Sequence, residues 1–227
     1  PNMAAQAEIK AEEFLRAGEK ALNKFSIFSS SSKYEDASDY FEKAANQYKI
    51  AKKCTEDDVP SPRDSCYAPQ HAVTYYRTAI SMQCDAGRFS NAAKLQKQIA
   101  EIYEQAGQMQ EALENYSQAA DYFIGENQPS SAQPMLLKVA QFSAELERYP
   151  SAIEIYEKVA KTSMESNLLK YNAKSHLLNA GICAMASKDI VLVKQKIDEF
   201  NEIDYTFPDS REGKFLSVTH RIVTVCT

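Results

Sequence analysis

Small and aromatic residues recur along the chain at spacings of three and four residues. Such spacings place the members of a set on one face of an α-helix, so each set predicts an amphipathic helix. The pattern is typical of core packing, in which alanines let helices approach closely and aromatic rings fill the next groove. It occurs at Ala37, Tyr40, Ala44 and Tyr48; at Ala72, Tyr76, Ala79 and Met82; at Ala112, Tyr116, Ala119 and Phe123; and at Ala152, Tyr156, Ala160 and Met164.

These sets repeat at a regular distance. The starts at Ala72, Ala112 and Ala152 are 40 residues apart, and alanines at 92, 132 and 173 interleave with them, so a new helix is expected about every 20 residues. Gly87, Gly107 and Pro150 fall at the junctions, where glycine and proline are common. Two helices per repeat predict an all-α protein, a tetratricopeptide-like α-solenoid of antiparallel helical hairpins. An irregular helical bundle is the alternative.

The solenoid is predicted to form a single domain over 1–227, with interruptions. Helix starts are expected where serine is followed three residues later by Glu or Gln, as at Ser32, Ser130 and Ser151. The expected parts are N-terminal helices over 5–53 with an apolar loop at 25–32, an irregular linker over 54–68, helical repeats over 69–212, and a divergent tail over 213–227. The linker contains Pro60 and Pro62, which favour a loop, and the end of the tail is rich in β-forming residues.

Composition and charge argue against several function classes. The net charge is −5 and the pI about 5.4, which disfavours a nucleic-acid binder, so any basic function must come from a local patch. Five cysteines without CxxC spacing indicate free thiols in a reducing compartment. The three histidines form no metal-binding pattern, and no glycine-rich phosphate loop or catalytic signature is present. We therefore expect no metal, no cofactor, no catalytic residues and no enzyme activity.

Several stretches of this sequence resemble the soluble NSF attachment protein family, of the alpha/beta type. The resemblance extends over most of the chain and is strongest at 25–49, 87–104, 116–140 and 153–174, with Asp209-Ser210-Arg211-Glu212 further on. It implies an adaptor in vesicle trafficking, including ER–Golgi transport. Such an adaptor binds the assembled SNARE four-helix bundle, of syntaxin-type and related SNAREs. It recruits the hexameric ATPase NSF, which disassembles the bundle after membrane fusion.

The resemblance also implies two sets of site residues. Because the SNARE bundle is acidic, the adaptor presents basic side chains on its concave face, and a basic position of the family is Pro134 here, which leaves a gap. The matching SNARE-binding positions are Arg88, Lys94, Lys138, Lys170 and Lys174. The apolar loop is expected to contact the membrane through Phe25, Ile27 and Phe28. The expected location is therefore cytoplasmic, with peripheral attachment to membranes. The alternative for the basic residues is that they lie on a solvated helix face. The alternative for the loop is that its apolar residues pack under the first hairpin.

The sequence departs from the family at two places. The 54–68 segment stands where the family has roughly one helical hairpin. Further on, the chain ends with residues 217–227, which match nothing in the family, where the family continues through another helical region. The resemblance assigns NSF stimulation to that last region, so the chain is expected to bind SNARE bundles but to fail in stimulating NSF-driven disassembly. The competing interpretation of the whole chain is a generic tetratricopeptide-like scaffold that binds an unrelated partner.

Overall fold

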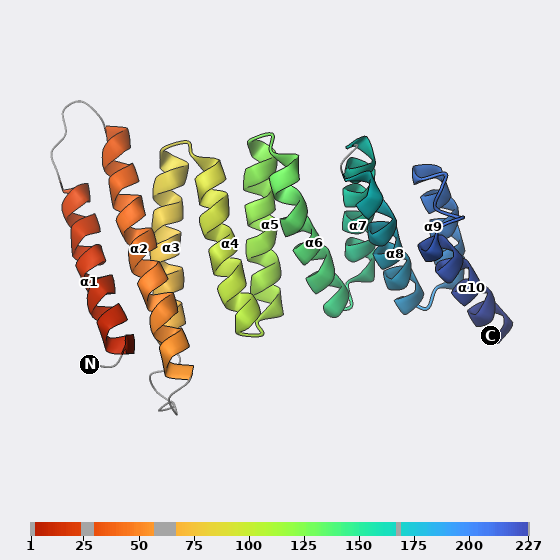
Figure 1. Cartoon of the computed structure of the whole chain (residues 1–227), viewed down its shortest axis with the longest axis horizontal. Helices are drawn as coiled ribbons and strands as arrows, with labels where there is room; N and C mark the ends of the chain where they lie inside the picture. Colours follow the sequence, from red (N-terminus) through yellow and green to blue (C-terminus); the bar gives the residue numbers. More distant parts are fainter. Residues whose placement is uncertain (1–2, 24–29, 57–66, 167–168, 227) are drawn as a thin grey trace. The chain divides into compact units, whose positions relative to one another are not determined.

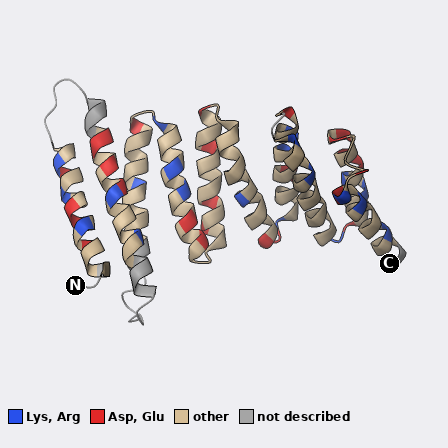
Figure 2. Ribbon diagram, in the orientation of Figure 1, with Lys and Arg blue, Asp and Glu red and all other residues tan. Residues whose placement is uncertain are grey.

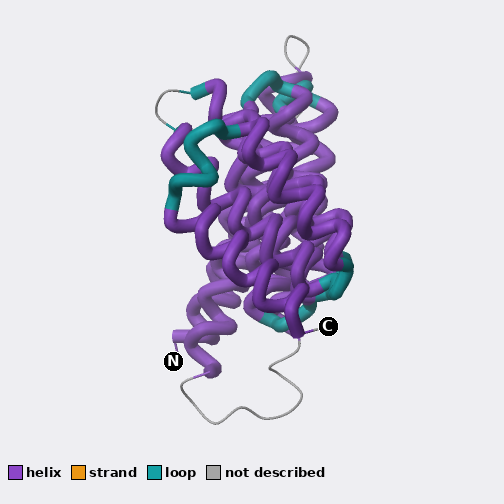
Figure 3. The backbone as a smooth tube through the Cα atoms, turned by 90° about the vertical axis from the view of Figure 1, so that its right-hand side faces the viewer, coloured by secondary structure: helices purple, strands orange, loops and turns teal. Residues whose placement is uncertain are grey.

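The protein is built from antiparallel α-helices. The computed structural model describes residues 3–23, 30–56, 67–166 and 169–226. These ranges contain ten α-helices joined by loops and turns, and no strand (Figures 1 and 3), which confirms the predicted all-α, tetratricopeptide-like class. The helices are α1 (Met3–Leu22), α2 (Ser30–Glu56), α3 (Tyr67–Asp85), α4 (Phe89–Gln105), α5 (Met109–Gly125), α6 (Pro129–Glu145), α7 (Tyr149–Glu165), α8 (Lys170–Ala186), α9 (Ile190–Ile203) and α10 (Arg211–Cys226).

The chain divides into two compact units, Pro1–Ala132 and Gln133–Thr227, each with its own core. The boundary falls within α6. In the first unit Ala72, Tyr76 and Ile99 lie in the centre of the core. In the second unit the corresponding centre contains Ala152, Leu177 and Phe200.

The repeated alanines lie where neighbouring helices touch. All eight alanines of the four sequence sets are fully buried, because a methyl group leaves no side chain to hold the helices apart. They are Ala37, Ala44, Ala72, Ala79, Ala112, Ala119, Ala152 and Ala160, each 0% exposed. Tyr76, Tyr116 and Tyr156 are buried beside them, so the predicted core stripe is confirmed in both units.

The turns before α4, α5, α6 and α7 share one backbone conformation. Their left-handed residues, which lie 20 positions apart, are Gly87 (φ 72°), Gly107 (φ 71°), Asn127 (φ 55°) and Glu147 (φ 59°). After each one, the next backbone N–H donates to a carbonyl five residues earlier, for example from Arg88 to Gln83 at 2.8 Å, which closes a Schellman turn. The next helix begins one residue later, at Phe89, Met109, Pro129 or Tyr149.

These tight turns set the helix starts earlier than the sequence predicted. Helix α7 is capped by the backbone of Arg148 without a side-chain hydrogen bond, with Pro150 in its first turn, so Ser151 already lies inside the helix. Ser130 lies inside α6 for the same reason. The predicted capping boxes at these serines are wrong, because the Schellman turn passes the chain directly into the next helix.

The end of the chain is helical although it is rich in β-forming residues. Residues 211–226 form α10, which packs on α8 and α9 within the second unit. Leu216 of α10 is fully buried against Gly181 of α8, where an added Cβ would lie 2.8 Å from Leu216 Cδ2. The weak helix preference of the valine and isoleucine residues is overridden by this packing.

The predicted irregular linker over 54–68 is helical at both ends. Helix α2 continues to Glu56 and α3 begins at Tyr67, so the prediction is wrong at these positions. The residues between them, including Pro60 and Pro62, lie outside the described residues.

Candidate functional site

The five predicted SNARE-binding residues belong to every second helix. Arg88 immediately precedes α4 and Lys94 lies on it, both in the first unit. Lys138 lies on α6, and Lys170 and Lys174 on α8, all in the second unit. The predicted residues therefore divide into two groups by unit, Arg88 and Lys94 in the first and Lys138, Lys170 and Lys174 in the second. Figure 2 shows how the lysines and arginines are distributed over the helices.

Arg88 is already engaged within the first unit. Its guanidinium forms an ion pair with Glu35 of α2, and both side chains are partly exposed, at 46% and 29%. Because exposed ion pairs contribute little to stability, this contact is easily exchanged for another carboxylate. The ion pair therefore positions Arg88 but leaves it able to bind another carboxylate.

Lys94 offers an accessible positive charge one turn and a half further along α4. Its side chain is exposed, and its Nζ donates to Asn91 Oδ1 at 3.5 Å, at the limit of a hydrogen bond. Lys94 also interacts with Glu42 of α2. The pKa of Glu42 is raised overall, mainly by burial and next by Asp39, and the charges of Lys43 and Lys94 oppose this rise. Among the described residues Lys94 forms no ion pair.

The second group combines lysines with aromatic rings. Lys138 Nζ lies 5.9 Å from the centre of the Phe142 ring, and Lys170 Nζ lies 5.6 Å from that of Tyr171, which is 78% exposed. Lys174 follows Lys170 by one helical turn, so both point from the same face of α8. The attraction between an ammonium group and an aromatic face positions such lysines, and their positive charge can attract an acidic surface.

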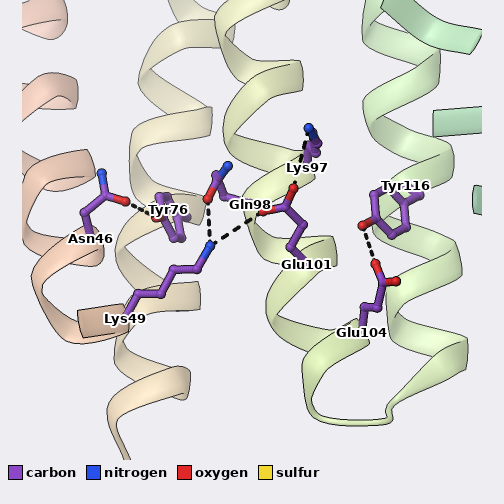
Figure 4. Close-up of polar contacts among 8 residues, drawn as sticks. All are labelled: Asn46, Lys49, Tyr76, Lys97, Gln98, Glu101, Glu104 and Tyr116. Atoms are coloured by element: carbon purple, nitrogen blue, oxygen red, sulfur yellow. Dashed lines mark hydrogen bonds and ion pairs between the residues drawn. The ribbon is translucent and has the colours of Figure 1, made fainter. Parts of the chain in front are cut away.

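Sequence reasoning missed a row of polar contacts that joins α2, α3, α4 and α5 in the first unit (Figure 4). Lys49 Nζ donates to Gln98 Oε1 at 2.9 Å and lies 3.6 Å from a Glu101 carboxylate oxygen. Tyr76 donates its hydroxyl hydrogen to Asn46 at 2.7 Å. Another tyrosine hydroxyl, that of Tyr116, donates to Glu104 at 2.6 Å.

This row fixes the register of the helices that carry the first basic group. Burial, and next the hydrogen bond to Glu104, raise the pKa of Tyr116, so its hydroxyl remains a donor. The partners of Lys49 are 49 and 52 positions away in the sequence, and no local pattern links residues so far apart.

The remaining predicted site residues cannot be placed. Phe25, Ile27 and Phe28 lie outside the described residues.

In the described part of the chain, no group of three or more His, Cys, Asp or Glu side chains is arranged to hold a metal ion. In the same part, the helices are too short or too polar to cross a bilayer.

The fold defines a protein built from antiparallel helical hairpins, with exposed lysines on α4 and α8. A family model described as "Soluble NSF attachment protein, SNAP" matches residues 9–57 and 64–223. The chain therefore belongs to the soluble NSF attachment protein family. This membership confirms both the predicted resemblance and the predicted role as an adaptor in vesicle trafficking.

Curated relatives agree with the family match. An alpha-soluble NSF attachment protein of Vitis vinifera is 37% identical, with 91% of this chain and 79% of the relative aligned. The protein of the same name from Mus musculus is 36% identical over 95% of this chain and 82% of its own. A probable vesicular-fusion protein sec17 homolog of Neurospora crassa is 31% identical over 91% and 79%.

The comparisons also bear on the predicted departures. The family match continues to residue 223, so the prediction that residues 217–227 match nothing in the family is wrong as far as residue 223. Among solved structures, a Podosopora anserina putative kinesin light chain with nearly identical TPR-like repeats has a TM-score of 0.47 and 12% identity, covering 91% of this chain and 99% of that chain.

Proposed function

We propose that this chain binds the assembled SNARE four-helix bundle through Arg88, Lys94, Lys138, Lys170 and Lys174 and recruits the NSF ATPase to it. It acts in the cytoplasm, at the membrane surface, as an adaptor without catalytic activity of its own. The observation that carries the proposal is the match of nearly the whole chain to the soluble NSF attachment protein family. The basic residues of α8 support it, because Lys170 and Lys174 are accompanied by no acidic residue on that helix, in a chain with a net charge of −5.

Charge complementarity explains how such a surface selects its partner. Exposed lysines meeting an acidic bundle speed the encounter and fix its register more than they add affinity. Because such charges are screened over about 10 Å in 0.1 M salt, binding weakens as salt rises. Arg88 takes part by exchanging its ion pair with Glu35 for a carboxylate of the bundle.

The proposal is tested by reversing one charge of each basic group. Lys94→Glu combined with Lys138→Glu is expected to weaken binding to the bundle about tenfold or more, since exposed charge pairs contribute up to about 1 kcal/mol each and reversal adds repulsion. Helicity is expected to stay unchanged, because Lys94 is exposed and Lys138 is only half-buried. Binding is measured by pull-down and titration at several salt concentrations.

A matched control carries the same charge change elsewhere. Lys10→Glu with Lys158→Glu alters one exposed lysine in each unit, on α1 and α7, and is expected to leave binding unchanged. Wild-type affinity and the absence of a salt effect in the Lys94 and Lys138 variant would refute the proposed site. Equal binding to the bundle and to a single SNARE helix would favour a generic peptide-binding scaffold instead.

We further propose that Phe25, Ile27 and Phe28 contact the membrane. Apolar side chains contribute about 25 cal/mol for each Å² removed from water, so three of them give weak, reversible attachment that adds to bundle binding through effective concentration. Phe25→Ser with Phe28→Ser is expected to reduce co-sedimentation with liposomes but not binding to the isolated bundle. A loss of several degrees in thermal stability would show instead that these residues are part of the core.

A further inference from the structure

Helix α10 exposes a row of large apolar side chains. Phe215, Val218 and Ile222 are 54%, 54% and 59% exposed. Their spacings of three and four residues put them on one face of the helix. Single exposed apolar residues are ordinary on protein surfaces, but three adjacent ones on one face require an explanation.

Positive charges lie along the same face. Arg211, Lys214 and Arg221 are exposed, and spacings of three and four residues place them beside the apolar row, next to Val218. The only acidic residue among 211–226 is Glu212, which is half-buried and points from another side of the helix. A chain with a net charge of −5 thus carries a local cationic face here.

The opposite side of α10 is occupied by its own unit. Leu216 is fully buried and packs on Gly181 of α8. Gly213 lies so close to Phe207 and Pro208 that an added Cβ would be 2.9 Å from the Phe207 carbonyl carbon. These contacts fix the rotation of the helix and direct the face made of Phe215, Val218, Ile222 and the three cations to the outside.

We propose that this outer face of α10 docks on an anionic lipid surface. Apolar side chains flanked by Lys and Arg are the pattern of a helix lying in a membrane interface, where the rings and branched chains leave water while the cations reach the phosphate and carboxylate headgroups. Charge complementarity selects an anionic bilayer over a neutral one. The contact goes beyond the adaptor function and uses neither the SNARE-binding residues nor the 25–28 loop.

The test uses the full chain with Phe25→Ser and Phe28→Ser, so that the proposed loop contact does not contribute. Co-sedimentation is measured with phosphatidylcholine vesicles and with vesicles that also contain phosphatidylserine. We expect binding only to the phosphatidylserine vesicles. Lys214→Glu with Arg221→Glu is expected to weaken it about 25-fold or more, because each cation near an anionic surface contributes about fivefold. Phe215→Ser with Ile222→Ser is expected to abolish it at physiological salt.

Two controls test whether vesicle binding depends on this face of α10. Val191→Ser with Tyr205→Ser removes other apolar side chains, 77% and 86% exposed in the same unit, and is expected to leave vesicle binding unchanged. Binding to the SNARE bundle is expected to be normal in every α10 variant, which separates this proposal from the adaptor function. The residues changed on α10 and in the control are exposed, so these changes are expected to shift thermal stability by no more than a few degrees.

Two results would overturn the proposal. The first is equal binding to neutral and anionic vesicles that the charge reversals do not change. The second is a dimer in light scattering that Phe215→Ser with Ile222→Ser converts to a monomer while vesicle binding persists, since a second copy would then be what covers the face.

Discussion

Replacing Gly181 with alanine tests how closely α10 packs on α8. Alanine is normally favoured over glycine in a helix interior by about 1 kcal/mol. At this position the added methyl would meet both methyl groups and Cγ of Leu216, at 2.8 Å from Cδ2 and 3.2 Å from Cγ. Leu216 is fully buried.

The clash is therefore expected to outweigh the gain in helix preference. Overpacking a filled core costs about 1–3 kcal/mol, and the crowding of a whole branched side chain favours the upper half of that range. Gly181→Ala should destabilise the protein by about 1–2 kcal/mol after the helix gain of about 1 kcal/mol is subtracted. For a chain of this length that is a fall in Tm of about 2–8 °C.

Gly125 provides the matched control. It ends α5, its φ is not positive, and a Cβ there would meet nothing within 4 Å. Gly125→Ala is expected to be neutral or to stabilise by up to about 1 kcal/mol. Both variants are compared by thermal and urea unfolding followed by far-UV circular dichroism.

A double-mutant cycle then decides whether the contact is the cause. Leu216→Ala alone should cost about 2–5 kcal/mol through the cavity that it leaves. In the double variant the methyl group added at position 181 has room, so the combined loss should be smaller than the sum by about 1–3 kcal/mol. Gly181→Ala at wild-type stability, with additive effects in the cycle, would refute the docking of α10 on α8.

Three further outcomes follow from single positions. Glu147 adopts the left-handed conformation that costs a non-glycine residue about 1–2 kcal/mol, so Glu147→Gly should stabilise the fold by about 0.5–1 kcal/mol in urea unfolding, and unchanged or lower stability would contradict this turn. Glu35→Gln frees Arg88 from its ion pair and should raise affinity for the SNARE bundle up to about fivefold, whereas weaker binding would mean that the pair preorganises Arg88. Burial lowers the pKa of His176, so the unfolded chain takes up its proton first and stability should fall as pH drops below about 6.5, by at most about 1.4 kcal/mol per pH unit. That slope is measured as Tm between pH 8 and 5.5 and should flatten in His176→Gln.

The sequence predicted the parts of the fold that repeat. The alanine and tyrosine positions at intervals of three and four are periodic, and periodicity determines which face of a helix is buried, so the core was identified from the sequence alone. Helix ends were harder to predict. Asn127 and Glu147 occupy turn positions equivalent to those of Gly87 and Gly107. Asparagine is frequent in the left-handed conformation, but a glutamate side chain gives no indication of it.

Contacts between distant segments were the part that the sequence could not provide. Helix α10 forms despite β-branched residues, because Leu216 packs against a glycine 35 positions away. The pair of Arg88 with Glu35 likewise joins α2 to the turn before α4, and these residues are 53 positions apart in the sequence. The candidate lysines themselves were chosen by resemblance, and their role in binding stays a prediction.

The left-handed turns at 20-residue intervals restrict how such a chain can change in length. Each of these turns leaves one residue between the left-handed position and the next helix. A single residue inserted within a helix would rotate the rest of that helix by about 100° and turn its alanines away from the core. Removing one helix would reverse the direction of all that follow. A change of 40 residues, from one left-handed position to the second one after it, preserves direction and buried face alike. Gain and loss of whole hairpins is therefore the mode of length variation that this architecture tolerates, and point insertions should be confined to connections outside the series of turns.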